Sequence, residues 1–336
     1  MTIEDLQLLL ARFADINVIV VGDFFLDRYL DIDPRVAEVS VETGLEARQV
    51  VGIRNQPGAA GTVTSNLCAL GVGCVRALGV IGDDGQGYDL KAGLQATGVN
   101  TTALIETPNR FTPTYTKPMN LQTGAEMERL DIKNRKPLSA DLEDRMIEAL
   151  NRLVPDVHGV IALDQVQEHN CGVLTQRVTN ALARLARAFP DKVFFADSRT
   201  RIMDFKHVIL KPNRDEARRA LALDWEGDLQ SCARAFSVQT GRPAFVTLGA
   251  DGILVANGDV LMHVPGIAVP PPIDIVGAGD SVSASVVSAL CAGASLTEAA
   301  LLGVLVSSIT IQQIGTTGTA SPNQVLDRFR TAYPEG

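Results

Sequence analysis

The stretch that decides the fold runs from Pro270 to Leu296 and reads PPPIDIVGAGDSVSASVVSALCAGASL. Three consecutive prolines cannot enter a helix or an inner strand, because proline has no backbone N–H and its ring blocks the preceding turn. The residues from Ser281 to Ala292 are small and apolar, which is typical of a buried helix. The tetrapeptide Gly277-Ala278-Gly279-Asp280 therefore lies where a loop becomes a helix.

Such a junction can bind an anion. The glycines let the backbone approach a ligand closely, and the first turn of the helix has free N–H groups with the helix dipole behind them. These donors would stabilise the negative charge that develops on a transferred phosphoryl group. Asp280 beside them could accept the proton of an attacking hydroxyl. The alternative is that Asp280 is only the N-cap of the helix, a position that aspartate favours.

On the N-terminal side of this junction, short apolar strands alternate with helical segments. The expected strands, each of which closes on Gly, Asp or Asn, are 17–23, 74–82, 159–164, 192–197, 207–213 and 243–249. The expected helices are 60–70, 89–97, 140–153, 171–188, 214–223 and 228–240. This alternation predicts an α/β fold with a doubly wound, mostly parallel sheet flanked by helices, whose ligand site lies at the carboxyl ends of the strands.

Two segments interrupt the alternation. Residues from about 28 to 56 and from about 110 to 131 have the pattern of strands with no helix between them. We interpret them as a small antiparallel sheet that forms a lid, inserted twice into the α/β core. No Pro-, Gly- or Ser-rich linker and no internal repeat divides the chain, so we expect a single domain over residues 1–336.

The composition excludes several classes of protein. Hydrophobic residues make up 46 % of the chain and charged residues 21 %, as in a globular protein with a large core. The net charge is −9 and no basic stripe is present, so we do not expect nucleic acid as a partner. The five cysteines form no CxxC pair, and the four histidines have no metal-ligand spacing. Because the sequence has neither a signal-peptide pattern nor a long apolar run, we expect a cytoplasmic protein without a membrane partner.

These features together resemble the PfkB, or ribokinase-like, family of carbohydrate kinases. The C-terminal signature of that family is close to DxTGAGD, and it stands here as Asp274 to Asp280 with Val276 in place of the usual threonine. The resemblance implies that Asp280 is the general base and that the backbone of Gly277 to Gly279 forms the anion hole. It extends over nearly the whole chain.

Further matches imply a site for the acceptor sugar. In the family, the acid at the position of Asp27 grips sugar hydroxyls, and Asp23 lies on the same turn after the first strand. The stretch QPGAAGTVTSNLCALG resembles the N-terminal signature PGGAANVAxNxAxLG, which places Gly58, Ala59 and Thr62 at the sugar. Ala59 replaces a glycine, and Thr62 replaces an asparagine. Because threonine cannot make the hydrogen bonds of an amide, the substrate could differ from the usual one.

Other matches imply a site for the nucleotide. The stretch KPNRDE resembles the NxxE motif, in which Asn213 and Glu216 order magnesium and the phosphates through water. The segment from Thr247 to Gly249 resembles the strand end against which the nucleotide lies, and Gly315 and Thr316 fall where a loop closes on adenine. The implied cofactors are ATP and Mg²⁺, with a monovalent cation such as K⁺ as a further candidate.

Several of these residues also have a structural interpretation. The spacing of Asn213 and Glu216 is that of a helix capping box, and Asp27 could be a solvated turn carboxylate. Lys117 could contact a substrate phosphate, or it could be a lid residue without a role in binding. The acids that end two adjacent strands could contact the phosphates and magnesium or cap the following helices; they are Asp164 and Asp197.

Within the family, the resemblance is closest to the heptose-7-phosphate kinase branch of ADP-heptose synthesis. It rests on GDFFLDRY near the start, TPTYTK in the lid, and the segment from Glu128 to Asp131. We expect ATP-dependent phosphoryl transfer to a hydroxyl of a sugar or sugar phosphate, with heptose 7-phosphate as a candidate acceptor. Bifunctional members carry a nucleotidyltransferase domain after the kinase domain. That domain is not in this sequence, so we expect this chain to supply the phosphorylation step alone.

Three alternatives remain open. The acceptor could be ribose, a fructose phosphate or a nucleoside. The chain could instead be a non-catalytic sugar- or nucleotide-binding homologue, as the departures at Ala59, Thr62 and Val276 suggest, although the intact GAGD argues against it. A dinucleotide enzyme should carry GxGxxG after the first strand, where Gly22 to Phe25 stands instead. The β-edges of the lid predict a homodimer in which two lids pair.

Overall fold

The computed structural model describes residues 1–222 and 228–334, so the expected end of the 214–223 helix lies outside the described residues. Its central element is an eight-stranded sheet in the order β16-β15-β14-β13-β12-β11-β1-β6. The strands are β1 (Asn17–Gly22), β6 (Cys74–Leu78), β11 (Gly159–Asp164), β12 (Val193–Ser198), β13 (Ile209–Leu210), β14 (Ala244–Thr247), β15 (Ile253–Asn257) and β16 (Val260–Val264). Neighbouring strands from β6 to β14 are parallel, and β15 and β16 extend the sheet antiparallel. The predicted α/β fold class is confirmed.

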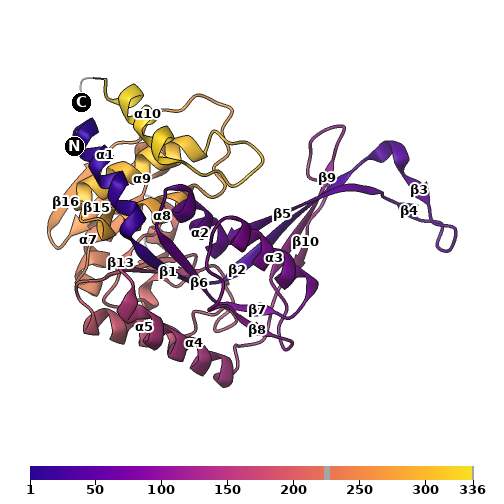
Figure 1. The fold of residues 1–336 in the computed structure, drawn as a ribbon, viewed down its shortest axis with the longest axis horizontal. Helices are drawn as coiled ribbons and strands as arrows, with labels where there is room; N and C mark the ends of the chain where they lie inside the picture. Colours follow the sequence, from indigo (N-terminus) through magenta and orange to yellow (C-terminus); the bar gives the residue numbers. More distant parts are fainter. Residues whose placement is uncertain (223–227, 335–336) are drawn as a thin grey trace.

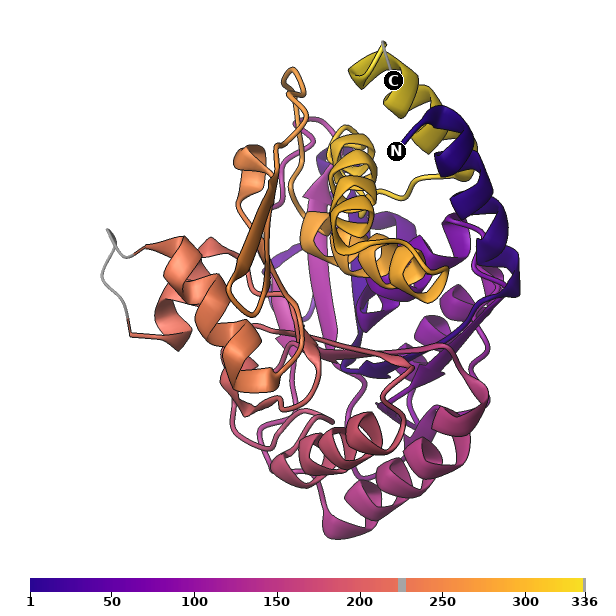
Figure 2. The ribbon, with the colours of Figure 1, turned by 90° about the vertical axis from the view of Figure 1, so that its left-hand side faces the viewer.

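Helices cover both faces of this sheet (Figure 2). Val18 and Val20 of β1 belong to one apolar cluster, and Ile19 and Val21 belong to the other. Because successive side chains of a strand point to opposite faces, a strand buried on both sides must be apolar throughout. The first cluster contains residues of α1 (Ile3–Ala11), α2 (Ala60–Ala69), α3 (Gly85–Ala96), α8 (Ala278–Cys291), α9 (Leu296–Thr310) and α10 (Pro322–Ala332). The second contains residues of α4 (Ala140–Leu153), α5 (Gln176–Ala188), α6 (Arg214–Ala220) and α7 (Leu229–Thr240).

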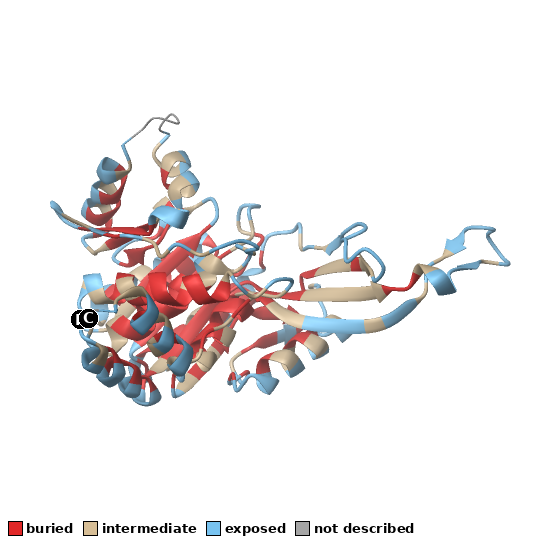
Figure 3. Cartoon of the chain, turned by 90° about the horizontal axis from the view of Figure 1, so that it is seen from above, coloured by how far each residue is buried: buried red, intermediate tan, exposed pale blue. Residues whose placement is uncertain are grey.

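A second sheet projects from the core (Figure 1). Its order is β10-β9-β2-β5, and its strands are β2 (Phe24–Ile32), β5 (Val50–Ala59), β9 (Thr114–Asn120) and β10 (Leu130–Ile132). A hairpin of β3 (Glu38–Val39) and β4 (Glu46–Ala47) lies at its far, exposed end (Figure 3). We call this sheet the lid.

The expectation of a purely antiparallel lid is wrong. Strand β2 pairs antiparallel with β5 but parallel with β9, so the sheet is mixed. The reason is that both strands start at the core and run outward. Strand β2 follows the carboxyl end of β1, and β9 starts just after Thr112, whose hydroxyl accepts a hydrogen bond from the N–H of Gly82.

Other expected elements differ in their bounds. The segment 74–82 divides at Gly79 into β6 and β7 (Val80–Gly82), and β7 pairs with β8 (Ile105–Thr107). The 171–188 helix begins only at Gln176, because the Thr175 hydroxyl caps it by accepting from the N–H of Val178. The predictions did not include α1, α9, α10 or β16. Among the described helices, none has the length and apolar character needed to cross a bilayer.

Candidate active site

The loop-to-helix junction stands where the sequence predicts it. Gly277 is the N-cap of α8 with φ +80°, a backbone conformation that favours glycine. Asp280 is the third residue of the helix, so the alternative that it is the N-cap is wrong. No side chain caps α8. Within the described residues, the N–H groups of Gly279 and Asp280 have no acceptor, which leaves them free for an anion.

Asp280 has a strongly perturbed carboxyl group. Burial raises its pKa to about 7, and repulsion by Asp197 adds to this, while Lys211 and Arg199 act in the opposite direction. A carboxylate with a pKa near neutrality is suited to accept a proton at physiological pH. The charged groups that act on Asp280 therefore come from the ends of β12 and β13 and from β2, far from α8 in the sequence.

Lys211 is a buried cation beneath the loop-to-helix junction, and the sequence analysis missed it. Its side chain is only 2 % exposed, and its ammonium lies 2.8 Å from the Oδ2 atom of Asp197. Ser283 donates a hydrogen bond of 3.1 Å to the same oxygen. The Nζ atom also lies 3.6 Å from the point where a Cβ on Gly279 would stand. Burial lowers the pKa of Lys211, but Asp197 and Glu216 outweigh that and hold it above its ordinary value.

The two acids that end adjacent strands do not cap the following helices. Asp197 pairs with Lys211 under the junction. Asp164 accepts hydrogen bonds from Ser198 and Arg201. The helix-cap alternative is therefore wrong for both carboxylates. A signal for Lys211 was present in the sequence, because a lysine directly before Pro-Asn at the end of a buried strand must lie at the carboxyl edge of the sheet.

Asp23 orders a loop of the core. Its carboxylate accepts backbone hydrogen bonds from Gln165 (3.1 Å), Val166 (3.2 Å) and Val173 (2.8 Å). Burial nevertheless raises its pKa above the ordinary value. These bonds give Asp23 a structural role in the 165–173 loop, and its direct contact with sugar hydroxyls stays a prediction.

The lid presents a compact group of polar residues to the core. Lys117 on β9 forms an ion pair of 3.0 Å with Asp27 on β2 and also donates to the hydroxyl of Tyr29. A Cβ at Gly58 would lie 2.4 Å from the Oδ2 atom of Asp27, so any side chain there would displace the Asp27 carboxylate. Asp27 lies within a strand and its charge acts on Asp280, so it is not a solvated turn carboxylate.

The two departures from the N-terminal signature are Ala59, which ends β5, and Thr62 in α2, which lies beside the junction. The Thr62 side chain is buried, and its Cγ2 atom is 3.3 Å from where a Cβ on Gly277 would stand. Its hydroxyl is 3.5 Å from the carbonyl oxygen of Pro57. Ala59 has φ +54° and ψ −118°, which a residue with a side chain rarely adopts.

Replacing Ala59 should therefore stabilise the protein. We expect Ala59→Gly to raise the free energy of unfolding by about 1 kcal/mol, because relief of a strained backbone exceeds the entropic cost of glycine. Urea denaturation would measure this. The matched control is Ala92→Gly, at an exposed position in the interior of helix α3, which should lower it by about 1 kcal/mol. Equal destabilisation by both substitutions would show that position 59 is not strained.

Asn213 and Glu216 do form a capping box on α6. The Asn213 side chain accepts from the N–H of Glu216 at 2.9 Å, and the Glu216 side chain accepts from the N–H of Asn213 at 2.8 Å. This uses one carboxylate oxygen of Glu216, and its other oxygen makes no hydrogen bond with the residues that the structure describes. Burial and the neighbouring Asp197 raise the pKa of Glu216.

The residues expected to contact the nucleotide lie on two loops. Thr247 ends β14, and Gly249 follows with φ +65°. Gly315 donates its N–H to Asp274 at 3.2 Å, and the Thr316 hydroxyl accepts from Gln56 of β5 at 3.0 Å. The 313–318 loop is thus bonded both to the segment before α8 and to the lid.

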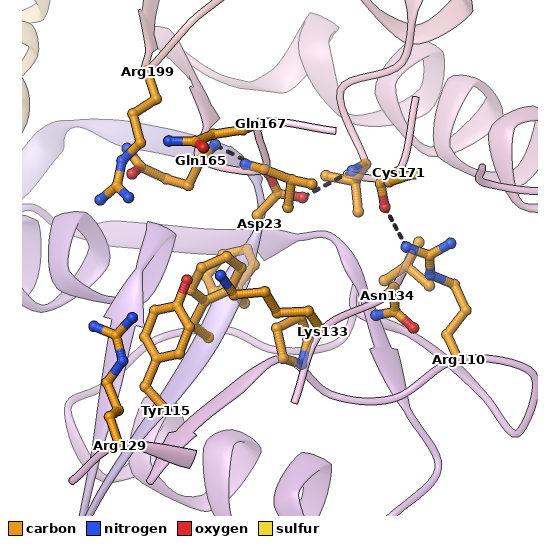
Figure 4. A pocket seen from close by; sticks show the side chains of 16 residues that line it. Asp23, Arg110, Tyr115, Arg129, Lys133, Asn134, Gln165, Gln167, Cys171 and Arg199 are labelled. Atoms are coloured by element: carbon orange, nitrogen blue, oxygen red, sulfur yellow. Dashed lines mark hydrogen bonds between the residues drawn. The ribbon is translucent and has the colours of Figure 1, made fainter. Parts of the chain in front are cut away.

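A cavity of about 320 Å³ lies between the lid and the core (Figure 4). Its lining residues come from the lid, from the loop before β9, from the end of β12 and from the 165–173 loop. The charged side chains among them are Asp23, Arg110, Arg129, Lys133 and Arg199. The sequence analysis did not identify the four cations, because they are dispersed along the chain.

A doubly wound core, a lid beside its carboxyl edge and an uncapped loop-to-helix junction are the features that the sequence predicted. Residues 17–324 match the model of the pfkB family carbohydrate kinases. The chain therefore belongs to the pfkB family and is a carbohydrate kinase.

Curated relatives agree with this assignment. The chain is 29 % identical over 338 residues to the bifunctional protein HldE of Pelobacter propionicus. The aligned region covers 99 % of this chain and 67 % of that protein. The bifunctional protein HldE of Geobacter sulfurreducens is 26 % identical with the same coverage. This chain thus spans about two thirds of the length of these relatives.

Solved structures share the fold. Phosphofructokinase-2 from Escherichia coli, in complex with substrates and products, superposes with a TM-score of 0.73 at 16 % identity, covering 94 % of this chain and 99 % of that one. The ribokinase of Arabidopsis thaliana, in complex with ribose and ATP, gives a TM-score of 0.70 at 17 % identity with the same coverage.

Proposed function

We propose that this protein transfers the γ-phosphoryl group of ATP to a hydroxyl of a sugar or sugar phosphate, with Asp280 as the general base. The observation that carries this proposal is the junction itself. A carboxylate with a pKa of about 7 stands in the same helical turn as two backbone N–H groups that have no acceptor in the described residues.

The acceptor would lie between lid and core, near Asp27, Gly58 and Thr62, with one hydroxyl directed at Asp280. As the hydroxyl oxygen attacks phosphorus, its proton passes to the Asp280 carboxylate and ADP leaves. The N–H groups of Gly279 and Asp280 would stabilise the charge on the transferred group. Lys211 beneath Gly279 would add a fixed positive charge.

The nucleotide would lie along Thr247, Gly249, Gly315 and Thr316. The Gln56–Thr316 hydrogen bond supports this arrangement, because it joins the lid to the loop that would close on the base. Lid closure would then exclude water, which competes with the sugar as an acceptor.

Magnesium would neutralise charge on the phosphates. The donor set fits an ion that keeps several waters, because one carboxylate oxygen of Glu216 has no hydrogen bond within the described part of the chain and Asn213 lies beside it. In the described residues, no three His, Cys, Asp or Glu side chains converge on a metal position. The site therefore suits a hydrated ion held largely by the phosphates. A monovalent cation such as K⁺ stays a candidate, tested by assaying activity with and without K⁺.

Heptose 7-phosphate is our first candidate acceptor, on the strength of the GDFFLDRY and TPTYTK stretches. Ribose, a fructose phosphate or a nucleoside are the alternatives. An ADP-release assay across these compounds tests the proposal. Activity with none of them would favour a non-catalytic sugar- or nucleotide-binding homologue.

The rate should depend on pH through Asp280. The base must be ionised to accept a proton, and its pKa is about 7. We expect kcat to fall about tenfold per pH unit below pH 7 and to level off above it. A pH–rate profile with saturating substrates would measure this. A profile that is flat between about pH 5 and pH 8 would contradict the assignment.

We also propose a homodimer that forms through the lid. Exposed apolar side chains on the lid and on the hairpin at its far end support this, among them Val39, Leu45, Ile53 and Leu130. Analytical ultracentrifugation tests it with Ile53→Asp, which should yield monomers. A wild type that is monomeric at micromolar concentration would exclude the dimer.

A further inference from the structure

Arg199 is a cation without a partner at the carboxyl edge of the core sheet. It follows directly after β12, two residues beyond Asp197. Its side chain makes no hydrogen bond and no ion pair with the residues that the structure describes, and the residue is exposed. Figure 4 shows its guanidinium group reaching from the core side toward the lid. A guanidinium group with no partner in the chain is available to bind an anion.

Two cavities meet at Arg199. The larger, of about 320 Å³, lies between lid and core, where the acceptor is proposed to bind. The smaller, of about 90 Å³, lies between the segment after β12 and helix α6, and its lining includes Glu216, the candidate magnesium residue. Among the described residues, Arg199 alone lines both cavities. Its side chain therefore lies between the place proposed for the acceptor and the place proposed for magnesium and the phosphates.

The charge of Arg199 also acts on the proposed base. Two cations stabilise the ionised carboxyl group of Asp280, and they are Lys211 and Arg199. Lys211 is already paired with Asp197 at 2.8 Å, whereas Arg199 has no such partner. Because Asp280 would take its proton from the hydroxyl that attacks phosphorus, the transferred phosphoryl group would lie next to Asp280. Arg199 is thus the unpaired cation on the side of the reacting group.

The reaction needs more donors than the junction supplies. During phosphoryl transfer, negative charge is spread over the three equatorial oxygens of the transferred group. The junction offers two backbone N–H groups without an acceptor in the described residues, those of Gly279 and Asp280. A guanidinium group has a planar fork of donors that can contact two phosphoryl oxygens at once. Arg199 can therefore bind oxygens that the helix end leaves without a donor.

We propose that Arg199 is a further catalytic residue, whose guanidinium group binds the transferred phosphoryl group in the transition state. As the acceptor oxygen forms its bond to phosphorus, the bond from phosphorus to the leaving oxygen of ADP breaks, and the hydroxyl proton passes to Asp280. Arg199 takes no proton in this step and only neutralises charge on the transferred group. This inference rests on the proposed function and assigns a residue to it that the sequence analysis did not identify.

Arg199→Gln tests this role through the division of its effect between kcat and KM. A residue that acts in the transition state contributes to kcat, so we expect kcat to fall about 10²- to 10³-fold and both KM values to change less than about threefold. The ADP-release assay measures this with ATP and whichever of ribose, fructose 6-phosphate and sedoheptulose 7-phosphate is turned over fastest. A raised acceptor KM with unchanged kcat would show that Arg199 only binds the acceptor, and it would overturn the proposal.

A second measurement needs no acceptor. Fluoroaluminate bound beside MgADP mimics the transferred phosphoryl group, so calorimetric titration with MgADP, with and without fluoroaluminate, isolates the contacts to that group. We expect fluoroaluminate to tighten the binding of MgADP to the wild type by about 100-fold. Arg199→Gln should remove most of this gain and leave the affinity for MgADP alone unchanged. A gain that survives the substitution, or no gain in the wild type, would contradict the proposal.

The pH dependence provides a readout that a structural role would not change. Removal of the positive charge in Arg199→Gln should raise the pKa of Asp280, so the midpoint of the pH–rate profile should move above 7. Arg199→Lys restores the charge without the planar fork, so it should return the midpoint toward 7 while kcat stays below that of the wild type. An unchanged midpoint in Arg199→Gln would place Arg199 away from the base and would count against the proposal.

Arg135→Gln is the matched control, because Arg135 is an exposed arginine that pairs with Glu168 at 3.6 Å and lines neither cavity. It should change neither the kinetics nor the binding of MgADP, and thermal melting would verify that every variant is folded. If Asp280→Asn lost activity and Arg199→Gln kept it, this inference would fail and the kinase assignment would stand. If the wild type neither bound MgADP nor phosphorylated any of the three acceptors, both would fail.

Discussion

Asp280→Asn should reduce kcat by about 10²- to 10⁴-fold while changing KM for ATP and sugar only slightly. Asparagine has nearly the same shape as aspartate, so the junction and its N–H groups should stay in place, but an amide cannot accept the proton of the attacking hydroxyl. Steady-state kinetics in the ADP-release assay would measure both parameters. The residual rate should also lose its dependence on pH near 7.

The same substitution should not destabilise the fold. The pKa of Asp280 is raised in the folded protein, from 3.8 to about 7, so the folded state binds this proton more strongly than the unfolded state does. The contribution of protonated Asp280 to the free energy of unfolding is therefore fully present below about pH 4 and is lost as pH rises through 7. At pH 8, Asp280→Asn removes this buried charge, and its melting temperature should equal or exceed that of the wild type.

Asp327→Asn is the matched control, because the Asp327 side chain is 74 % exposed on α10. It should change neither kcat nor stability. If Asp280→Asn kept more than about a tenth of the wild-type kcat, another group would have to be the base.

Lys211→Met should lower the free energy of unfolding by about 3–5 kcal/mol. The substitution leaves the Asp197 carboxylate buried without its cation, and breaking one side of a buried ion pair has an effect of about this size. Urea denaturation monitored by circular dichroism would measure it at neutral pH.

Two further variants test the physical cause. Lys91 pairs with Glu106 at 2.6 Å, but both side chains are exposed, so Lys91→Met should lower stability by less than about 1 kcal/mol. Combining Lys211→Met with Asp197→Leu should recover most of the loss, because the carboxylate that would lose its ion-pair partner is then removed as well. If the stability loss of the double variant equalled the sum of the losses of the two single variants, the effect would come from packing instead.

Much of the core was predictable from the sequence. The bounds of β11 and α4 were predicted as the structure has them, because an all-apolar run between polar ends and a strongly amphipathic helix are local patterns. Helix α9 was missed because it is apolar around its whole circumference, which gives no periodic signal. It is buried between α8, α10 and the β15–β16 hairpin.

The pairing of lid strands was not predictable in the same way. The residue pattern of β2 and β9 shows that both are strands, but parallel pairing depends on where each leaves the core. By contrast, the spacing of Asn213 and Glu216 did predict the capping box, because its partners lie within one helical turn.

The amino-acid sequence by itself determined the α/β core, the position of Gly277 and Asp280 at a loop-to-helix junction, and the resemblance to carbohydrate kinases. Only the tertiary structure decided that Asp197, Lys211 and Arg199 surround this carboxylate and that cations of the lid and core share one cavity. The physical reason is how far apart in the sequence the interacting residues lie. Caps, turns and buried strands depend on residues a few positions apart, whereas the charges around Asp280 come from parallel strands whose carboxyl ends meet at one edge of the sheet.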